Sequence, residues 1–239
     1  MTACRFQASA VLVALFTSAV PVSAQSSLPP STNDARPTFV ARSHAFWEAS
    51  GVLLTASLVF DERLRSIALA NHTRTLDRLS GGADILGTAG HIVPALVATY
   101  AGARLFGKRS FAAATLRVGL SYAAADAVES LLKPAIGRYR PYTGREPLTF
   151  RPFSADGDHH SFPSAHVVHI SSLATAIATE SGRPWVTALA AVATCYVGAQ
   201  RVYRDQHWSS DVVASGMLGL EVSQTVTAWL HSRQPPRTR

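Results

Sequence analysis

The sequence predicts an all-α protein, a bundle of six helices, from its length, composition and hydrophobic pattern. The chain has 239 residues, which suits one compact domain with a short appendage. Hydrophobic residues make up 47% and charged residues only 15%, and this balance excludes an intrinsically disordered protein. Aromatic residues are only 8%, so small and aliphatic residues supply the apolar surface, which favours packed helices over a β-sandwich.

The N-terminal residues 1–24 have the layout of a secretory signal peptide. Arg5 precedes an apolar run over residues 8–20, and small residues end at Ala24, where a signal peptidase would cut. A retained N-terminal anchor is the alternative. Residues 25–44 are rich in Pro and Ser and are expected to form a linker without a core face.

The helical domain is expected to cover residues 45–230, followed by a basic tail over residues 231–239. Six long apolar stretches without two-residue alternation predict its helices. They are Phe46–Phe60, Ile85–Leu105, Ala112–Leu132, His166–Glu180, Trp185–Val202 and Val212–Leu230. Few of these runs approach the roughly 20 uncharged residues of a membrane span, so soluble and membrane bundles both stay open.

Breaks between the stretches predict where helices end. Charged residues 61–63 are expected to close the first helix, and Lys133 with Pro134 the third. Repeated Gly and Pro residues then predict a long irregular loop over residues 134–160. A loop of this length in a compact domain is usually functional or disordered, and four arginines favour function here.

The segment from Ser161 to His166 is typical of a helix start. Ser161 can cap a helix whose first turn holds Pro163. This places Ser164 and the amides of Ala165 and His166 at the positive end of the helix, where a phosphate oxyanion binds well. Taken alone, the segment is also compatible with an ordinary helix cap.

His207 and Asp211 stand four residues apart near the expected start of the last helix. If the helix begins near His207, both side chains share one face and the carboxylate accepts the proton of one ring nitrogen. The other nitrogen then keeps its lone pair and can act as a nucleophile. A surface His–Asp pair is the alternative for this pattern alone.

Two cations, Lys133 and Arg140, border the long loop. A lysine supplies a mobile point charge and an arginine a planar fork, which together match several oxygens of a phosphoryl group. Basic residues beside a loop are otherwise usually solvated, so this pair gains meaning only with the other two clusters.

Together, the three clusters resemble the signature of the type 2 phosphatidic acid phosphatase and vanadium haloperoxidase superfamily, in its phosphatase branch. That signature is Lys-x6-Arg-Pro, then Pro-Ser-Gly-His, then Ser-Arg-x5-His-x3-Asp. Nine of its eleven positions match here, Arg201 among them, and the departures are Ala165 for Gly and Gln200 for Ser. The resemblance covers about residues 45–230 and implies the six-helix core of that family.

The resemblance also implies a metal-independent phosphatase with a phosphohistidine intermediate. His207 would attack phosphorus, Asp211 would orient it, and His166 would serve as general acid and then base. The oxygens would be held by Lys133, Arg140, Ser164, the amide of Ala165 and Arg201. No metal or cofactor is expected, although vanadate can bind as a phosphate mimic.

The net charge of +7 and the expected export favour an anionic lipid surface or substrate over nucleic acid. We therefore expect an enzyme of the periplasm or cell envelope that acts on phosphate monoesters or diphosphates, with lipids such as phosphatidic acid or polyprenyl diphosphate preferred. A vanadate-dependent haloperoxidase is one alternative. An envelope protein that binds anions without turnover is the other, prompted by Ala165 and Gln200.

Overall fold

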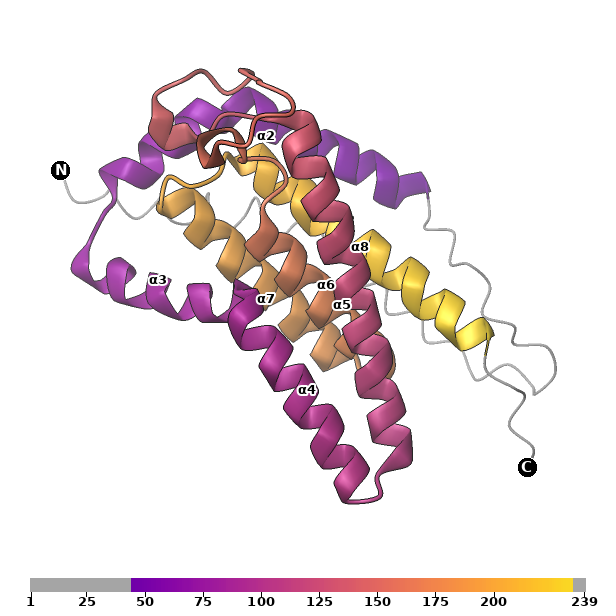
Figure 1. The fold of residues 1–239 in the computed structure, drawn as a ribbon. Helices are drawn as coiled ribbons and strands as arrows, with labels where there is room; N and C mark the ends of the chain where they lie inside the picture. The colour runs from indigo at the N-terminus through magenta and orange to yellow at the C-terminus, as the bar shows by residue number, and fades with distance from the viewer. Residues whose placement is uncertain (1–43, 234–239) are drawn as a thin grey trace.

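A computed structural model describes residues 44–233 of the chain, with side chains from residue 47 (Figure 1). The described part has seven α-helices, two short 3-10 helices and no β-strand, which confirms the predicted all-α fold. The helices are α2 (His44–Ala70), α3 (Arg74–Gly87), α4 (Ala89–Leu105), α5 (Arg109–Ile136), α6 (Ala165–Ser181), α7 (Pro184–Tyr203) and α8 (Ser209–Ser232). The predicted signal peptide, residues 25–43 of the predicted linker and residues 234–239 of the predicted tail lie outside the described residues.

The expected ends of the first and third helices were wrong. Helix α2 continues through residues 61–63 to Ala70, because Asp61 is buried among hydrogen-bond donors while Glu62 and Arg63 lie on the exposed face. Helix α5 runs about one turn past Lys133 to Ile136, and Gly137 is its C-cap residue.

Gly137 ends α5 for two physical reasons. Its φ of 62° is left-handed, a conformation that glycine adopts without the steric cost of a side chain. A Cβ at this position would also lie only 2.0 Å from the carbonyl oxygen of Arg151, so the returning loop passes too close for any other residue. The loop over residues 137–164 thus starts at a position that only glycine can occupy without strain.

Helix α3 was not predicted. It begins with Thr73, whose hydroxyl accepts a hydrogen bond from the Leu76 amide at 3.2 Å. Its mixed polar sequence, with Gly81 and Gly82, hides the helical pattern from a search for apolar runs. The predicted stretch Ile85–Leu105 therefore spans the end of α3, a break at Thr88 and all of α4.

The order of the helices brings four helix ends to one end of the bundle. Helix α6 lies at the centre and packs against α5, α7 and α8 (Figure 1). The C-terminal ends of α5 and α7 meet the N-terminal ends of α6 and α8 there, and the junction of α3 with α4 lies against α6. The predicted catalytic segments all occupy this end.

Small residues allow the central helices to approach closely. A Cβ at Gly219 on α8 would lie 1.9 Å from the hydroxyl of Ser171 on α6, so the two backbones are close at this crossing. Beside it, the hydroxyl of Ser223 donates to the Ser172 carbonyl at 2.9 Å. The aliphatic core next to this crossing is formed by Val167, Ile170, Val197, Val202 and Val212. The close crossing fixes the N-terminal ends of α6 and α8 relative to each other.

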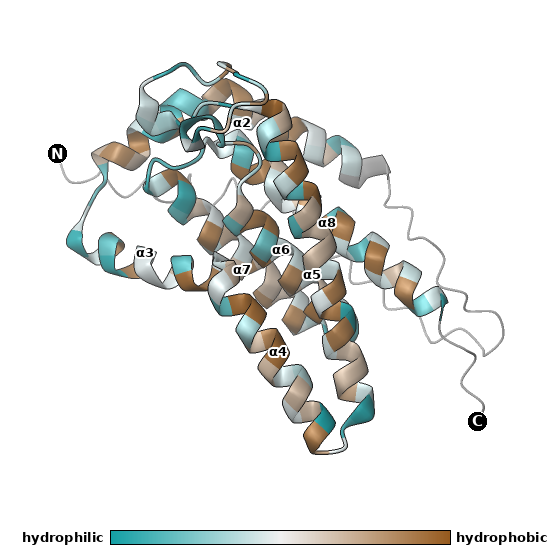
Figure 2. Cartoon of the chain, viewed as in Figure 1, coloured by the Kyte–Doolittle hydropathy of each residue, from teal (hydrophilic) through white to brown (hydrophobic). Residues whose placement is uncertain are grey.

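Hydrophobic residues are frequent along the hairpin of α4 and α5 (Figure 2), and several of their large side chains are exposed. Large exposed residues of this hairpin include Val93, Val97, Leu105, Phe106, Phe111, Leu116 and Leu120. Within residues 44–233, no helix taken singly has the length and apolarity of a membrane span. Helices α3 and α4 meet that test only as a pair, with a bend of 52° between them.

Candidate active site

The structure brings the three predicted clusters together at one end of the bundle. His207 lies in the turn between α7 and α8, and His166 lies in the first turn of α6. Lys133, Arg140 and Arg201 all lie near enough to His207 to lower its pKa.

His207 is buried, with only 4% of its surface exposed, and its tautomer is fixed by the backbone. Its Nδ1 lies 2.6 Å from the carbonyl oxygen of Ser161. Because a carbonyl can only accept, Nδ1 carries the proton and Nε2 keeps its lone pair. Burial, and then the nearby cations, hold the pKa of His207 well below its usual value, so the ring is neutral.

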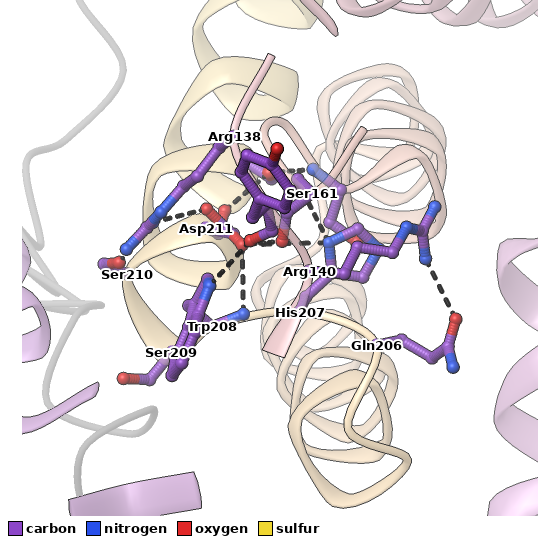
Figure 3. A network of polar contacts seen from close by, with 12 residues as sticks. Arg138, Arg140, Ser161, Gln206, His207, Trp208, Ser209, Ser210 and Asp211 are labelled. Carbon is purple, nitrogen blue, oxygen red and sulfur yellow. Dashed lines mark hydrogen bonds and ion pairs between the residues drawn. The ribbon is translucent and has the colours of Figure 1, made fainter. Parts of the chain in front are cut away.

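Asp211 plays a different part from the one expected. Helix α8 begins at Ser209, not near His207, and Asp211 Oδ2 lies 3.9 Å from His207 Nδ1, beyond hydrogen-bond distance. Asp211 Oδ2 instead accepts from the Ser161 hydroxyl at 2.5 Å and from the Trp208 amide at 3.0 Å (Figure 3). Asp211 therefore fixes Ser161, and the carbonyl of Ser161 in turn fixes His207.

Arg138 neutralises Asp211 from the opposite side. Its guanidinium donates to Asp211 Oδ1 at 2.5 Å and to Asp61 Oδ2 at 2.9 Å, and all three side chains are almost fully buried. Burial raises the pKa of Asp211, whereas Arg138, Ser161 and the Trp208 amide act in the opposite direction. The ionised form of Asp211 thus depends on these donors.

Asp61 of α2 completes this buried network. It accepts from the Ser209 hydroxyl at 2.6 Å and from both the amide and the hydroxyl of Ser210, at 2.9 and 2.5 Å. The two carboxylates lie on either side of one guanidinium, and every carboxylate oxygen is hydrogen-bonded. This network forms a rigid support beneath His207.

The start of α6 has hydrogen-bond donors without partners, next to this buried network. Ser164, not Ser161, is the N-cap residue, and the helix begins at Ala165. The Ser164 hydroxyl is buried and has no partner among the described residues, and the first amides of a helix have no partner within it. Such a set of donors suits an anion, so Ser164 and the Ala165 amide stay the candidates for holding one.

The cations of the site are held by neighbouring groups. Lys133 pairs with Glu129 one turn earlier on α5. Arg140 donates to the Gly157 carbonyl at 3.1 Å and to Gln206 Oε1 at 2.9 Å. Arg201 is buried, and within residues 44–233 its Nε has no hydrogen-bond partner. An unpartnered buried guanidinium N–H is a second sign of an anion-binding pocket.

His166 is held far more loosely than His207. Its side chain is 26% exposed, and its Nε2 lies 3.3 Å from the Thr88 hydroxyl and 3.7 Å from Asp84 Oδ1. The Thr88 hydroxyl donates its proton to the Asp84 carbonyl, so it can only accept from His166, which places a proton on Nε2. Burial, followed by Arg201, lowers the pKa of His166 to about 4, and Asp84 opposes this.

Several residues of the site escaped the sequence analysis. Arg138 and His159 are both buried, at 3% exposed each. Asp61 and Asp84 contact the site from distant parts of the chain and follow no local motif. Ser161 was predicted as a helix cap, and its contacts to Asp211 and His207 were not. The one usable signal was Asp61 itself, an acidic residue directly after the apolar run Val59–Phe60. No group of three or more potential metal ligands occurs in the described part of the chain.

Two solved structures share this fold. One is a transmembrane PAP2-type phosphatidylglycerolphosphate phosphatase from Bacillus subtilis, with a TM-score of 0.57 and 19% identity over 98% of each chain. The other is LpxE from Aquifex aeolicus, with a TM-score of 0.50 and 16% identity over 70% of this chain and 94% of that one. No curated protein sequence matches the chain.

A family model supports the same relationship from sequence. The model of the PAP2 superfamily matches residues 114–235, which is just over half of the chain. The matched region contains all the predicted site residues, from Lys133 to Asp211. The chain therefore belongs to the PAP2 superfamily, as its three motifs predict.

Proposed function

We propose that the protein is a metal-independent phosphatase that transfers the phosphoryl group of its substrate to His207. The carrying observation is the neutral, buried imidazole of His207, whose Nδ1 proton is committed to the Ser161 carbonyl and whose surroundings are cationic. A histidine in this state presents a lone pair to an anion, as nucleophilic catalysis requires.

The proposed first step forms a bond between Nε2 of His207 and phosphorus and breaks the bond from phosphorus to the leaving oxygen. The negative charge of the bound substrate raises the pKa of His166, and the imidazolium form of His166 donates a proton to that oxygen as it leaves. The charge on the three remaining oxygens is met by donors around the pocket. These are Lys133, Arg140, Arg201, the Ser164 hydroxyl and the Ala165 amide.

In the second step, His166 removes a proton from water, whose oxygen attacks phosphorus and breaks the bond to His207. Inorganic phosphate leaves, and both imidazoles return to their starting states. Asp211 does not touch the reacting atoms in this scheme. It balances the positive charge of phosphorylated His207 and holds Ser161, as its hydrogen bonds indicate.

We further propose that the substrate is a lipid phosphate and that the enzyme is exported and works at a membrane of the cell envelope. The α4–α5 hairpin carries large exposed apolar side chains, which suit contact with acyl chains. The similar Bacillus protein is a transmembrane phosphatase of phosphatidylglycerolphosphate. Phosphatidic acid and polyprenyl diphosphate are the candidate substrates for this chain.

Phosphate release tests the chemistry. We expect wild-type protein to release phosphate from an aryl phosphate with EDTA present, and from phosphatidic acid in detergent micelles at least about tenfold more efficiently. His207→Ala should reduce turnover by about 10⁴-fold or more, and His166→Ala by about 10²- to 10⁴-fold. Equal activity in all three proteins would refute the proposal. Halide oxidation by the vanadate-loaded protein, without phosphate release, would favour a haloperoxidase instead.

A further inference from the structure

Asp84 places a carboxylate inside the site from a helix that carries no part of the family signature. It lies on α3, before the region that the PAP2 model matches. Its Oδ1 is 3.2 Å from a terminal nitrogen of Arg201 and 3.7 Å from Nε2 of His166. An acidic group thus stands between the cation that would bind the phosphoryl group and the histidine that would protonate the leaving oxygen.

Hydrogen bonds from Gln200 and Thr88 hold Asp84 in position. The amide of Gln200 donates to Asp84 Oδ1 at 3.2 Å, and the Thr88 hydroxyl donates to the Asp84 carbonyl at 2.6 Å. Gln200 is one of the two departures from the family signature, which has Ser at this position. The longer side chain of Gln200 reaches an acid from α3, so the departure and the extra carboxylate belong to one arrangement.

The charges around His166 give Asp84 its first effect. The charged and titratable groups that act on His166 are Arg201 from α7, Lys133 from α5, His169 from α6 and Asp84 from α3. The first three disfavour a proton on His166, and Asp84 alone favours it. Without Asp84, the general acid would lose its proton at a lower pH.

Asp84 has a second effect on the anion that the pocket receives. Its side chain is 46% exposed, and its Oδ1 lies beside Arg201 and His166, the two groups that would face the phosphoryl group. A carboxylate at this position competes with the ligand for Arg201 and repels each negative charge on it. The repulsion grows with the charge of the ligand and opposes dianions most.

We propose that Asp84 is a positioning and selectivity residue of the phosphoryl site, which favours the protonated form of His166 and weakens the binding of doubly charged phosphoryl groups. The proposal rests on the proposed phosphatase function for its effect on turnover. Its effect on anion binding is independent of turnover. Asp84 therefore increases the rate of the chemical step and prevents the product phosphate from binding too tightly.

Asp84→Asn is the direct test, because asparagine keeps an acceptor oxygen for Gln200 and Arg201 and removes only the charge. Calorimetric titration with inorganic phosphate at about pH 8 should show at least about fivefold tighter binding than wild type. With an aryl phosphate, kcat should fall about tenfold at neutral pH, and the basic limb of its pH profile should move to lower pH. KM should fall together with kcat, a combination that simple structural damage does not produce.

Matched variants separate charge from structure. Asp77→Asn makes the same charge change on the same helix, where Asp77 accepts from the Tyr203 hydroxyl, and should leave phosphate affinity and the pH profile unchanged. Asp84→Glu keeps the charge and should restore most of the wild-type behaviour. Asp84→Ser replaces Asp84→Asn if that variant does not give a wild-type circular dichroism spectrum.

Two results would overturn the proposal. One is phosphate affinity within about twofold of wild type in the neutral variants; the other is an unmoved basic limb of the pH profile. A wild-type protein without turnover would refute the phosphatase instead. In that case the calorimetric comparison still decides whether Asp84 opposes anion binding.

Discussion

The two histidines of the site have opposite surroundings. His207 is 4% exposed and stands on a network in which Asp211, Arg138 and Asp61 satisfy one another. His166 has a 26% exposed side chain, and its polar contacts to Thr88 and Asp84 are long, at 3.3 and 3.7 Å. The fold therefore fixes one imidazole and leaves the other adaptable.

The difference matches the two proposed tasks. A nucleophile must keep one tautomer and one orientation, which the Ser161 carbonyl and the buried ion pairs provide. The acid and base must exchange a proton first with a leaving oxygen and then with water, so it needs access to solvent and freedom to adjust. The following substitutions test whether rigidity is confined to the His207 side.

The largest effect is expected for Arg138→Leu. This change leaves the carboxylates of Asp61 and Asp211 buried without their shared cation, and we expect a loss of about 3–5 kcal/mol in the free energy of unfolding. Urea denaturation in a detergent that keeps the protein monodisperse would measure it. Adding Asp61→Leu to Arg138→Leu should recover part of the loss, because one unpaired charge is removed.

A loss below about 1 kcal/mol in Arg138→Leu would mean that the network contributes little and that water replaces the guanidinium. The contrast between the two sides of the site would then be one of exposure alone. Additive effects in the double variant would lead to the same conclusion.

The sequence predicted the parts of the molecule that follow local patterns. Long apolar runs indicated α2 and α4 to α8, and the signature spacing indicated His166, His207 and the cations near them. The network beneath His207 was hidden because its members are far apart in the chain. Asp61 and Arg138 are separated by 77 residues, and each looks like an ordinary charged residue in its own segment.

The role of Asp211 shows the same limit within a motif. Its spacing of four residues from His207 suggested a helical pair, but the helix starts at Ser209 and the direct hydrogen bond is not formed. The intermediary is Ser161, whose hydroxyl and carbonyl contact Asp211 and His207. Only the packing of the loop after α5 against α8 produces this arrangement.

Ser161→Ala is expected to have the next largest effect. It removes one donor from the buried Asp211 carboxylate and should lower the free energy of unfolding by about 1–3 kcal/mol. Because Ser161 lowers the pKa of Asp211, its loss raises that pKa further. The native carboxylate then gains its proton at higher pH, so acid should reduce kcat at a higher pH than in wild type.

The measurement is a urea titration together with the acid limb of the pH profile of kcat. Ser154→Ala, which alters a serine that contacts His159 in the same loop, is the control and should leave the acid limb in place. An unmoved acid limb in Ser161→Ala would contradict the dependence of Asp211 on its donors.

The smallest effect tests the adaptable side. Gly87 closes α3 directly against His166, and a Cβ there would lie 2.7 Å from Cβ and Cδ2 of the imidazole side chain. Gly87→Ala must therefore displace His166, and we expect kcat to fall about tenfold. Gly81→Ala on the same helix meets no atom within 4 Å and serves as the control, with unchanged kcat.

The two variants should differ in activity and resemble each other in stability. Replacing Gly by Ala inside a helix stabilises it by about 0.5–1 kcal/mol, which offsets the cost of moving a partly exposed side chain in Gly87→Ala. Thermal unfolding should thus stay close to wild type while kcat falls. A Gly87→Ala protein that unfolds several degrees earlier would show that His166 is held as firmly as His207, and the contrast between the two histidines would fail.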